Sequence, residues 1–545
     1  MNRHASSTFI LKASPMAISS RGGGYNEAFA AWASGDAERA LALCARLPHG
    51  VATSSRVTLL RARALLRLRR PRETAALLEA AADPDVPPCD QAVRAMLLGI
   101  AYARAGDVDA GLRILAGAEA MQPEDAAVRS EIALAIALAH YQRRDFTAAG
   151  RALERVDPAS GTVHARALEC RGWIAKCEND FAASYEAFEA SLHELERRRP
   201  LDGLVEANLV ATMSYIAIEL LDLDRWHALE RRAQDVRWET SGLEYFAFWF
   251  DLNRSMAYEL EGRPREALQA ARNAGARAPS TAFRIFAECR RAAVLFAYGE
   301  LLGYEDLAAS IRRELDAIDF RLLHEFEEIN VPVVVAETLA LIGDGAGAAQ
   351  TLQRLDTMSP TQLALLHDEP MKRGYITFVD GLVADANGDA FRAQHRYRDA
   401  LAAFNAIGMT RRSLFAALRC AQLTRDDALI HRVDRMTRTL PPGSWMRRET
   451  ARLAAWRADP VLASLTRAER EVLELLAGGM STGQIASERG RSMQTIRNTV
   501  SKMLRTFGVD NRQALINECA ARGAFSRPTT TAGSDSPSES PSGSA

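Results

Sequence analysis

Residues 99–123 read GIAYARAGDVDAGLRILAGAEAMQP, and from the pattern in this stretch we predict the fold. Apolar residues recur at helical spacing before and after the pair Gly106-Asp107. Glycine accepts the left-handed backbone conformation at which a helix ends, so this pair predicts a turn between two helices. Small residues such as Gly99 stand where the helices would touch, and Pro123 closes the unit. The stretch therefore predicts a helical hairpin.

Similar turn pairs recur along the chain. They are Gly35-Asp36, Gly106-Asp107, Asn179-Asp180, Gly262-Arg263, Gly343-Asp344 and Gly388-Asp389. With less regular breaks between them, the interval is about 35 to 45 residues, which is typical of a helical solenoid. The unit resembles the tetratricopeptide (TPR) repeat, and residues 25–459 have room for roughly eleven helix pairs. We expect the concave face of this solenoid to bind a protein or a small effector.

Composition excludes several classes of protein. The 545 residues include 68 basic and 69 acidic ones, so the chain is not basic throughout. This total does not exclude a local basic patch. The seven cysteines are scattered, which argues against a disulfide framework and against a metal site. We also expect no cofactor. No sequence of the form G-x-x-x-x-G-K-[ST] is present, and no G-x-S-x-G or H-E-x-x-H motif stands out, so we do not expect an enzyme.

Neither a secretory signal nor a membrane span is expected, because every apolar run is far shorter than the ~18 residues that a span requires. We therefore expect a cytoplasmic protein. Residues 526–545 are poor in apolar residues and are predicted to form a disordered tail, and residues 1–24 are predicted to be disordered as well. Between them we predict a repeat domain at 25–459 and a small four-helix domain at 460–525. The predicted fold class is all-α.

The small domain begins its helices with recognisable caps. Thr466 and Glu469 have the spacing of a capping box, in which each side chain bonds the backbone amide of the other residue. Ser481 and Gln484 repeat this spacing at the start of a short second helix. Ser492 is placed to cap a third helix after a glycine turn. The segment therefore predicts a helix, a tight turn and a further helix.

The third helix has an apolar face and a polar, cationic face. Ile496, Val500, Met503 and Phe507 share one face and are predicted to enter the core. The opposite face presents Gln494, Asn498, Ser501 and Arg505, with Arg497 and Lys502 beside it. Such a helix after a short helix and a turn is typical of the helix-turn-helix unit, whose second helix enters the major groove of DNA.

The sequence of this segment resembles the LuxR-type (GerE) DNA-binding domain of bacterial transcription regulators. The residues that carry this resemblance are the runs Leu465–Leu473, Leu475–Ser481, Gln484–Ala486, Ser492–Ile496 and Phe507–Val509, together with Arg512. The resemblance implies base contacts from Arg497, Asn498 and Ser501. Phosphate contacts are expected from Thr482, Ser492, Thr495, Lys502 and Arg505. The fourth helix, after Asp510-Asn511, is the surface through which such domains commonly dimerise.

Some residues depart from the pattern of this family. Arg489 and Arg491 stand where the family usually has apolar residues, and we expect both side chains to extend outward, toward phosphates. Thr499 replaces a frequent histidine, and Phe507 replaces a leucine. These changes affect the turn and the base preference that we expect, but not the identification of the domain.

Two functions fit the sequence. In the first, the chain is a bacterial transcriptional regulator that binds double-stranded promoter DNA as a homodimer, receives a protein or small effector on its repeats, and has RNA polymerase as a candidate partner. In the second, it is a protein-interaction scaffold with a vestigial helix-turn-helix. The sequence names neither the target genes nor the direction of regulation.

Overall fold

The computed structural model is built from helices, with no strand in the part of the chain that it describes. The described residues are 23–33, 36–52, 54–81, 86–197, 203–239, 243–299, 304–319, 330–357, 370–522 and 524. Two compact units divide the chain, residues 1–417 and residues 418–545. The tails predicted at 1–24 and 526–545 lie outside the described residues, apart from residues 23 and 24, which begin the first described helix.

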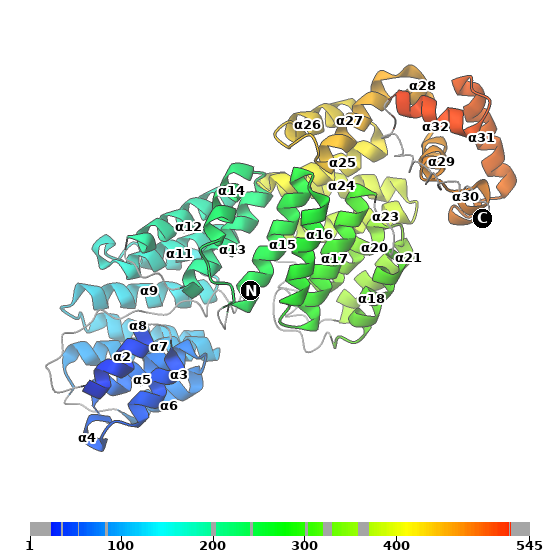
Figure 1. Cartoon of the computed structure of the whole chain (residues 1–545). Helices are drawn as coiled ribbons and strands as arrows, with labels where there is room; N and C mark the ends of the chain where they lie inside the picture. The colour runs from blue at the N-terminus through cyan, green and yellow to red at the C-terminus, as the bar shows by residue number, and fades with distance from the viewer. Residues whose placement is uncertain are drawn as a thin grey trace, which may run out of the picture. The chain divides into compact units, whose positions relative to one another are not determined.

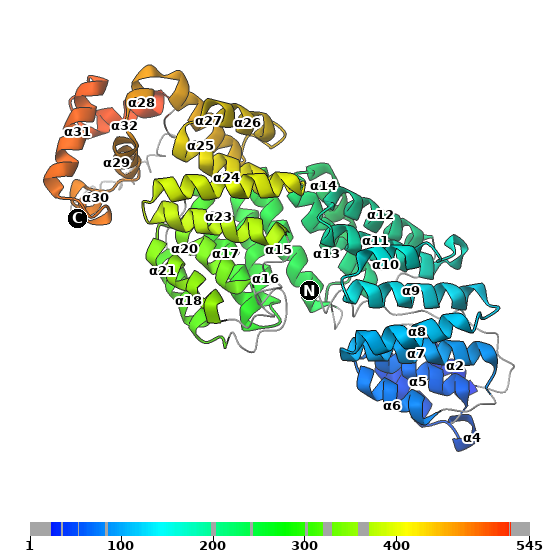
Figure 2. The ribbon, with the colours of Figure 1, turned by 180° about the vertical axis from the view of Figure 1, so that it is seen from behind.

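The first unit is a series of helix pairs that follow one another in chain order (Figures 1 and 2). Ten consecutive pairs lie in its described part: α2 (Gly23–Ala33) with α3 (Ala37–Ala45), α5 (Ser55–Arg67) with α6 (Pro71–Ala80), α7 (Pro88–Ala105) with α8 (Val108–Ala120), α9 (Ala126–Gln142) with α10 (Phe146–Leu153), α11 (Thr162–Cys177) with α12 (Phe181–Glu196), α13 (Gly203–Glu219) with α14 (Leu223–Ala233), α15 (Glu244–Glu261) with α16 (Pro264–Ala276), α17 (Thr281–Tyr298) with α18 (Tyr304–Asp316), α20 (Val331–Leu341) with α21 (Gly345–Gln353), and α23 (Pro370–Ala386) with α24 (Ala390–Ala406). The short helix α4 (His49–Ala52) lies between the first two pairs. The predicted all-α, TPR-like solenoid is confirmed.

The turn between the helices of a pair repeats one local design. At Gly106 the backbone is left-handed, with φ of 107°, and Asp107 then caps α8 by accepting a hydrogen bond of 3.0 Å from the Ala110 amide. A positive φ followed by a capping aspartate also occurs at 144–145, 179–180, 221–222, 343–344 and 388–389. The left-handed residue ends one helix and the carboxylate satisfies an amide at the start of the next. The predicted hairpin turn is therefore confirmed.

Close contact within a pair depends on glycine. A Cβ added to Gly99 would lie 2.7 Å from the side chain of Leu115 and 2.9 Å from the carbonyl oxygen of Gly111 on α8. A Cβ added to Gly381 of α23 would lie 2.9 Å from the ring of Tyr397 on α24. All three distances are shorter than a real Cβ atom tolerates. The small residues of the repeat pattern are thus required where the paired helices meet.

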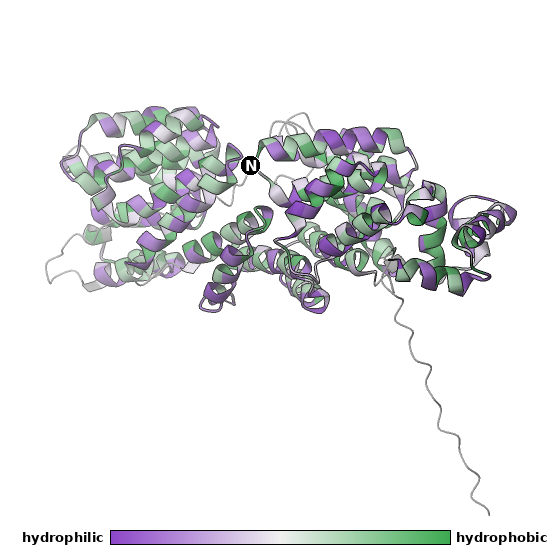
Figure 3. Cartoon of the chain, turned by 90° about the horizontal axis from the view of Figure 1, so that it is seen from above, coloured by the Kyte–Doolittle hydropathy of each residue, from purple (hydrophilic) through white to green (hydrophobic). Residues whose placement is uncertain are grey.

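Hydrophilic residues are interleaved with hydrophobic ones along the helices, as Figure 3 shows. Of the helices that the structure describes, none has the length and apolar composition of a membrane span.

The second unit contains the helices that follow the repeats. They are α26 (Asp427–Thr437), α27 (Trp445–Ala458), α28 (Pro460–Ser464), α29 (Arg467–Ala477), α30 (Thr482–Glu488), α31 (Met493–Phe507) and α32 (Arg512–Ala521), while α25 (Thr410–Thr424) begins before residue 418 and ends after it. This unit thus includes α26 and α27, which the sequence analysis assigns to the repeats. The domain bounds 25–459 and 460–525 remain a prediction.

Candidate nucleic-acid interface

The helix starts of the small domain have the predicted caps. The Thr466 amide donates to the carboxylate of Glu469 over 2.8 Å, and the Glu469 amide donates back to Thr466 Oγ1 over 3.3 Å. Ser481 and Gln484 form the same reciprocal pair at the start of α30, with distances of 2.8 and 3.3 Å. Ser492 Oγ accepts from the Thr495 amide at the start of α31 over 3.1 Å. All three predicted caps are therefore confirmed.

Residues 489–492 form the turn that joins α30 to α31. It passes through Gly490, whose φ of 57° is left-handed, and the Arg491 amide donates to the carbonyl of Ala486 over 2.9 Å. These bonds finish α30 and let the chain change direction before Ser492 caps the next helix. The helices α30 and α31 thus form a helix-turn-helix unit.

The predicted core stripe of α31 is confirmed. Ile496, Met503 and Phe507 are buried, and Val500 is half-buried against the same core. They pack with Leu473 and other apolar residues of α28, α29, α30 and α32. Burial of one face fixes which residues of α31 point away from the domain.

The face of α31 that points away from the core is polar and cationic. Its exposed residues are Gln494, Arg497, Asn498, Ser501, Lys502 and Arg505. The Gln494 side-chain amide donates to the Asn498 Oδ1 over 3.0 Å, so these two side chains support one another one helical turn apart. The structure therefore brings the three predicted base-reading residues onto one accessible surface.

The other predicted phosphate contacts lie at helix starts. Thr482 is the first residue of α30 and is half-buried, whereas Ser492 and Thr495 are exposed at the start of α31. Their hydroxyls also hydrogen-bond to one another, with Ser492 Oγ and Thr495 Oγ1 2.8 Å apart. A helix start presents unpaired amide groups and a partial positive charge, which favour a phosphate oxygen.

Two cations that the sequence directs toward DNA form ion pairs inside the domain. Lys502 Nζ lies 2.5 Å from Glu469 Oε1, and the guanidinium of Arg489 pairs with Glu471, which also accepts from Arg467 Nε over 2.8 Å. Arg489 therefore turns to α29, whereas the sequence predicts that it extends toward phosphates. The sequence analysis missed both pairs because their partners lie on another helix. Arg491 is exposed, as predicted.

The carboxylate of Glu469 is buried, and donor groups face both of its oxygen atoms. Its side chain is 8% exposed, Oε2 accepts from the amide and hydroxyl of Thr466 at 2.8 Å each, and Oε1 faces Lys502. Burial by itself would raise the pKa of this carboxyl. The hydrogen bonds from Lys502 and Thr466 outweigh burial and hold the pKa of Glu469 below its usual range.

The cations left exposed lie around the recognition helix. In the described part of this domain, Arg491, Arg497 and Arg505 are exposed and form no ion pair. Arg505 Nε donates weakly to the carbonyl oxygen of Ser501 over 3.4 Å. Arg497 and Arg505 lie on the outer face of α31, and Arg491 immediately precedes that helix. A local basic surface therefore exists on a chain with a formal net charge of −1.

Helix α27 also contributes to this domain, which the sequence did not indicate. Trp456 is 2% exposed and belongs to the same apolar core as the four helices α29–α32. The Arg522 guanidinium pairs with Asp459, the cap of α28, over 2.9 Å. Both contacts lie outside the family motif, so nothing in that motif indicates them.

The apolar residues of α32 are used within the domain. Leu515, Ile516 and Cys519 are buried in its core. The exposed side includes Gln513 and Asn517, whose side-chain amides are joined by a bond of 3.2 Å. The exposed side of α32, where the family resemblance predicts a dimer surface, is therefore polar.

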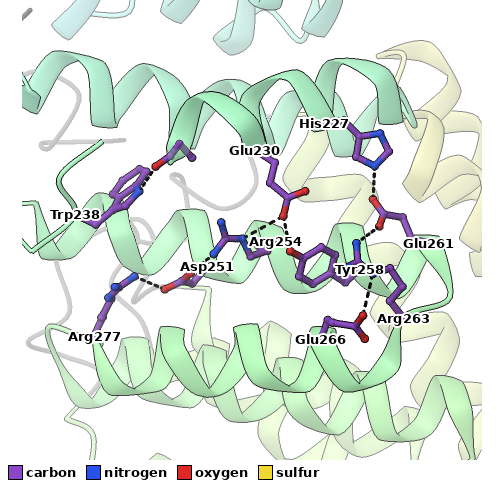
Figure 4. Close-up of polar contacts among 11 residues, drawn as sticks. His227, Glu230, Trp238, Asp251, Arg254, Tyr258, Glu261, Arg263, Glu266 and Arg277 are labelled. Atoms are coloured by element: carbon purple, nitrogen blue, oxygen red, sulfur yellow. Dashed lines mark hydrogen bonds and ion pairs between the residues drawn. The ribbon is translucent and has the colours of Figure 1, made fainter. Parts of the chain in front are cut away.

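The repeats contain a polar network of titratable groups (Figure 4). It joins α14, α15 and α16, and each of its guanidinium groups faces at least one carboxylate. The ion pairs are Arg263–Glu261, Arg263–Glu266, Arg254–Glu230, Arg254–Asp251 and Arg277–Asp251, at 2.6 to 3.6 Å, and His227 Nε2 forms a hydrogen bond of 2.8 Å with Glu261 Oε1. Because its charged groups face groups of opposite charge on neighbouring helices, the network stabilises the packing of successive helices of the solenoid.

Comparisons with known proteins bear on the small domain and the repeats separately. Residues 463–519 match the family of bacterial regulatory proteins called the luxR family. The spore germination protein GerE of Bacillus subtilis (strain 168) is 41% identical over 59 residues, which are 11% of this chain and 80% of that protein.

Two solved helical structures are similar over longer stretches. The Rap protein complexed with competence and sporulation factor is 11% identical, with a TM-score of 0.39, over 63% of this chain and 99% of that one. The Cut9-Hcn1 hetero-tetramer of APC/C is 13% identical, with a TM-score of 0.35, over 81% and 88%. The family assignment therefore rests on the small domain: the chain belongs to the LuxR family of bacterial regulatory proteins, with the helix-turn-helix domain of that family at residues 463–519.

Proposed function

We propose that this chain is a DNA-binding transcriptional regulator, in which α31 reads promoter DNA from the major groove. The observation that supports this most directly is the exposed face of α31, where Arg497, Asn498 and Ser501 stand side by side above a buried apolar stripe. Arginine suits guanine and asparagine suits adenine, because each offers two hydrogen bonds that match the base edge.

Phosphate contacts hold this helix in register in the proposed complex. We assign them to Thr482, Ser492 and Thr495 at the helix starts and to Arg505 on the outer face. Arg491, exposed before α31, is a further candidate. The ammonium of Lys502 faces Glu469 and is not assigned to phosphate.

The active form in this proposal is a homodimer on promoter DNA, with contacts to RNA polymerase as a further partner. A promoter-binding protein works where the chromosome is, which in a bacterium is the cytoplasm. No reaction is assigned to the chain, because its function in this proposal is binding.

The repeats would supply the regulation. Nearly all charged side chains buried in the described part of the first unit lie on the first helix of a pair, and several of them bond to the first helix of another pair. Examples are Arg63 with Glu131 over 3.2 Å and Asn208 with Glu169 over 3.1 Å. We propose that a protein or small effector binds this polar side of the solenoid and changes the activity of the regulator.

Selection of bound duplexes from a random pool, using the full chain, tests the DNA-binding function. We expect an enriched motif, and Arg497→Ala should weaken binding to it by ~1–3 kcal/mol because one base contact is lost. Arg113→Ala removes an exposed arginine of α8 and serves as the matched control. Absence of duplex binding even at about 50 mM salt, where phosphate contacts are strong, would contradict the proposal and favour the scaffold with a vestigial helix-turn-helix.

A comparison of the full chain with residues 418–545 tests the regulatory role of the repeats. Genome-wide occupancy should show the same promoters for both proteins. If the repeats receive a signal, only the full chain should change its occupancy with growth conditions. An identical response of both proteins would remove the repeats from the proposed regulation.

A further inference from the structure

Lys502 differs from the other exposed cations of the recognition helix in what its ammonium group contacts. Nζ lies 2.5 Å from Glu469 Oε1, whereas Arg497 and Arg505 extend from the same helix without an ion pair. The two partners come from α31 and from the first turn of α29. The ion pair therefore connects the helix that would read DNA to the helix behind it.

The partner of Lys502 is not an ordinary surface carboxylate. The side chain of Glu469 is 8% exposed, against 60% for Lys502, and its other oxygen is held by the amide and hydroxyl of Thr466. If Lys502 moved to a phosphate, Oε1 of a buried carboxylate would lose the cation that faces it. That loss costs more than breaking an ion pair between two exposed groups.

A second ion pair supports the same arrangement. Glu471, two residues after Glu469 on α29, pairs with Arg489 at the end of α30. The carboxylates of α29 thus hold both the turn and the recognition helix. A rigid supporting shell of this kind fixes the pose of residues that bind a ligand.

We propose that Lys502 is a positioning residue: through Glu469 it sets the angle of α31 against α29, and it does not contact phosphate. This inference rests on the proposed DNA-binding function. It gives Lys502 a different role from the one implied by the family resemblance, and the two roles predict opposite effects for one conservative substitution.

Glu469→Gln is that substitution. Glutamine also serves at this position of a capping box, so the start of α29 is preserved while the charge that holds Lys502 is removed. If Lys502 positions the helix, Glu469→Gln should weaken binding to the selected motif about three- to tenfold. If Lys502 contacts phosphate, removing a competing negative charge should strengthen binding to every duplex.

Lys502→Gln completes the experiment in the full chain. We expect the same three- to tenfold loss for the selected motif, with affinity for a scrambled duplex and the dependence on salt unchanged. The double variant should lose no more than either single one, because both substitutions break one interaction. A uniform loss on both duplexes, with the salt slope reduced by about 0.9, is the behaviour of a phosphate contact and would overturn the inference. Arg505→Gln provides the matched removal of one charge from the same face.

Hydrogen exchange in the free full chain gives a readout that does not depend on DNA. Amides of residues 493–507 should exchange faster in Glu469→Gln and in Lys502→Gln, and unchanged exchange in both would overturn the inference. Circular dichroism of each variant confirms that the helices are kept. If the wild-type chain selects no motif, the proposed function fails; if it selects one and the variants behave as phosphate contacts do, only the inference fails.

Discussion

The indole Nε1 of Trp456 donates a hydrogen bond to the backbone carbonyl of Ala524 across 3.2 Å, and both residues are buried. This bond ties α27 to the chain that follows α32. The guanidinium groups of Arg425 and Arg470 lie 5.5 and 5.9 Å from the centre of the indole ring. The core of the DNA-binding domain therefore includes a side chain that precedes the predicted start of that domain.

Trp456→Ala should reduce the free energy of unfolding of the second unit by about 3 to 5 kcal/mol, because it empties a large buried site. Trp456→Phe should cost less, since it keeps most of the apolar contact and loses the hydrogen bond to Ala524. Urea unfolding of a fragment spanning residues 418–525, followed by circular dichroism, measures both. A cost below about 1 kcal/mol for Trp456→Ala would show that the indole is not part of this core.

A fragment that begins at residue 460 should be less stable than one that begins at 418. The shorter fragment lacks Trp456 and the Asp459 partner of Arg522, although both fragments contain α29–α32 complete. We expect a difference of about 3 kcal/mol or more in the free energy of unfolding. Equal midpoints in urea for the two fragments would contradict this prediction.

Gly99→Ala should destabilise the repeats by about 1 to 3 kcal/mol, because the added methyl group would overlap Leu115 and the Gly111 carbonyl oxygen. Gly117→Ala in the partner helix is the matched control, since a Cβ there meets no atom within 4 Å. It should stabilise its helix by up to about 1 kcal/mol. Thermal unfolding of the full chain compares the two variants. If both variants lost stability, the overlap of the Gly99→Ala methyl group with α8 would not be the cause of its destabilisation.

The contribution of Glu469 to stability should depend on pH in a defined direction. A carboxyl whose pKa in the folded state lies below its value of about 4.3 in the unfolded state stabilises the fold above that value, and the contribution is lost as the pH falls through the folded-state pKa. Above about pH 5, Glu469→Gln should therefore lower the free energy of unfolding of the 418–525 fragment by about 1 to 2 kcal/mol. The difference from wild type should shrink as the pH falls below about 4.

Urea titrations of both proteins between pH 3 and pH 7 measure that difference. Glu518→Gln is a suitable control, because Glu518 pairs with Arg522 on the surface of α32 with a side chain 37% exposed. If the difference in the free energy of unfolding between wild type and Glu469→Gln stayed constant across this pH range, the assigned pKa shift would be contradicted.

Interactions between near neighbours in the chain were predictable from the sequence. The capping boxes at Thr466 and Ser481 need only a side chain and an amide three residues apart, and the turn at Gly106 needs one left-handed residue and one capping aspartate. The core stripe of α31 follows from the helical period. The base and phosphate contacts and the dimer remain predictions, since they concern molecules that the chain alone does not contain.

By itself, the sequence determined the helices, their caps and turns, the repeat architecture and the face of α31 that is exposed, because each depends on residues a few positions apart. Only the tertiary structure decided that Lys502 pairs with Glu469, that Arg489 turns to Glu471 and that Trp456 completes the core of the small domain. These partners are separated by many residues, and a charge or an indole at a given position is compatible with several neighbours. Packing of the helices selects among them, since it alone fixes which side chains come within reach.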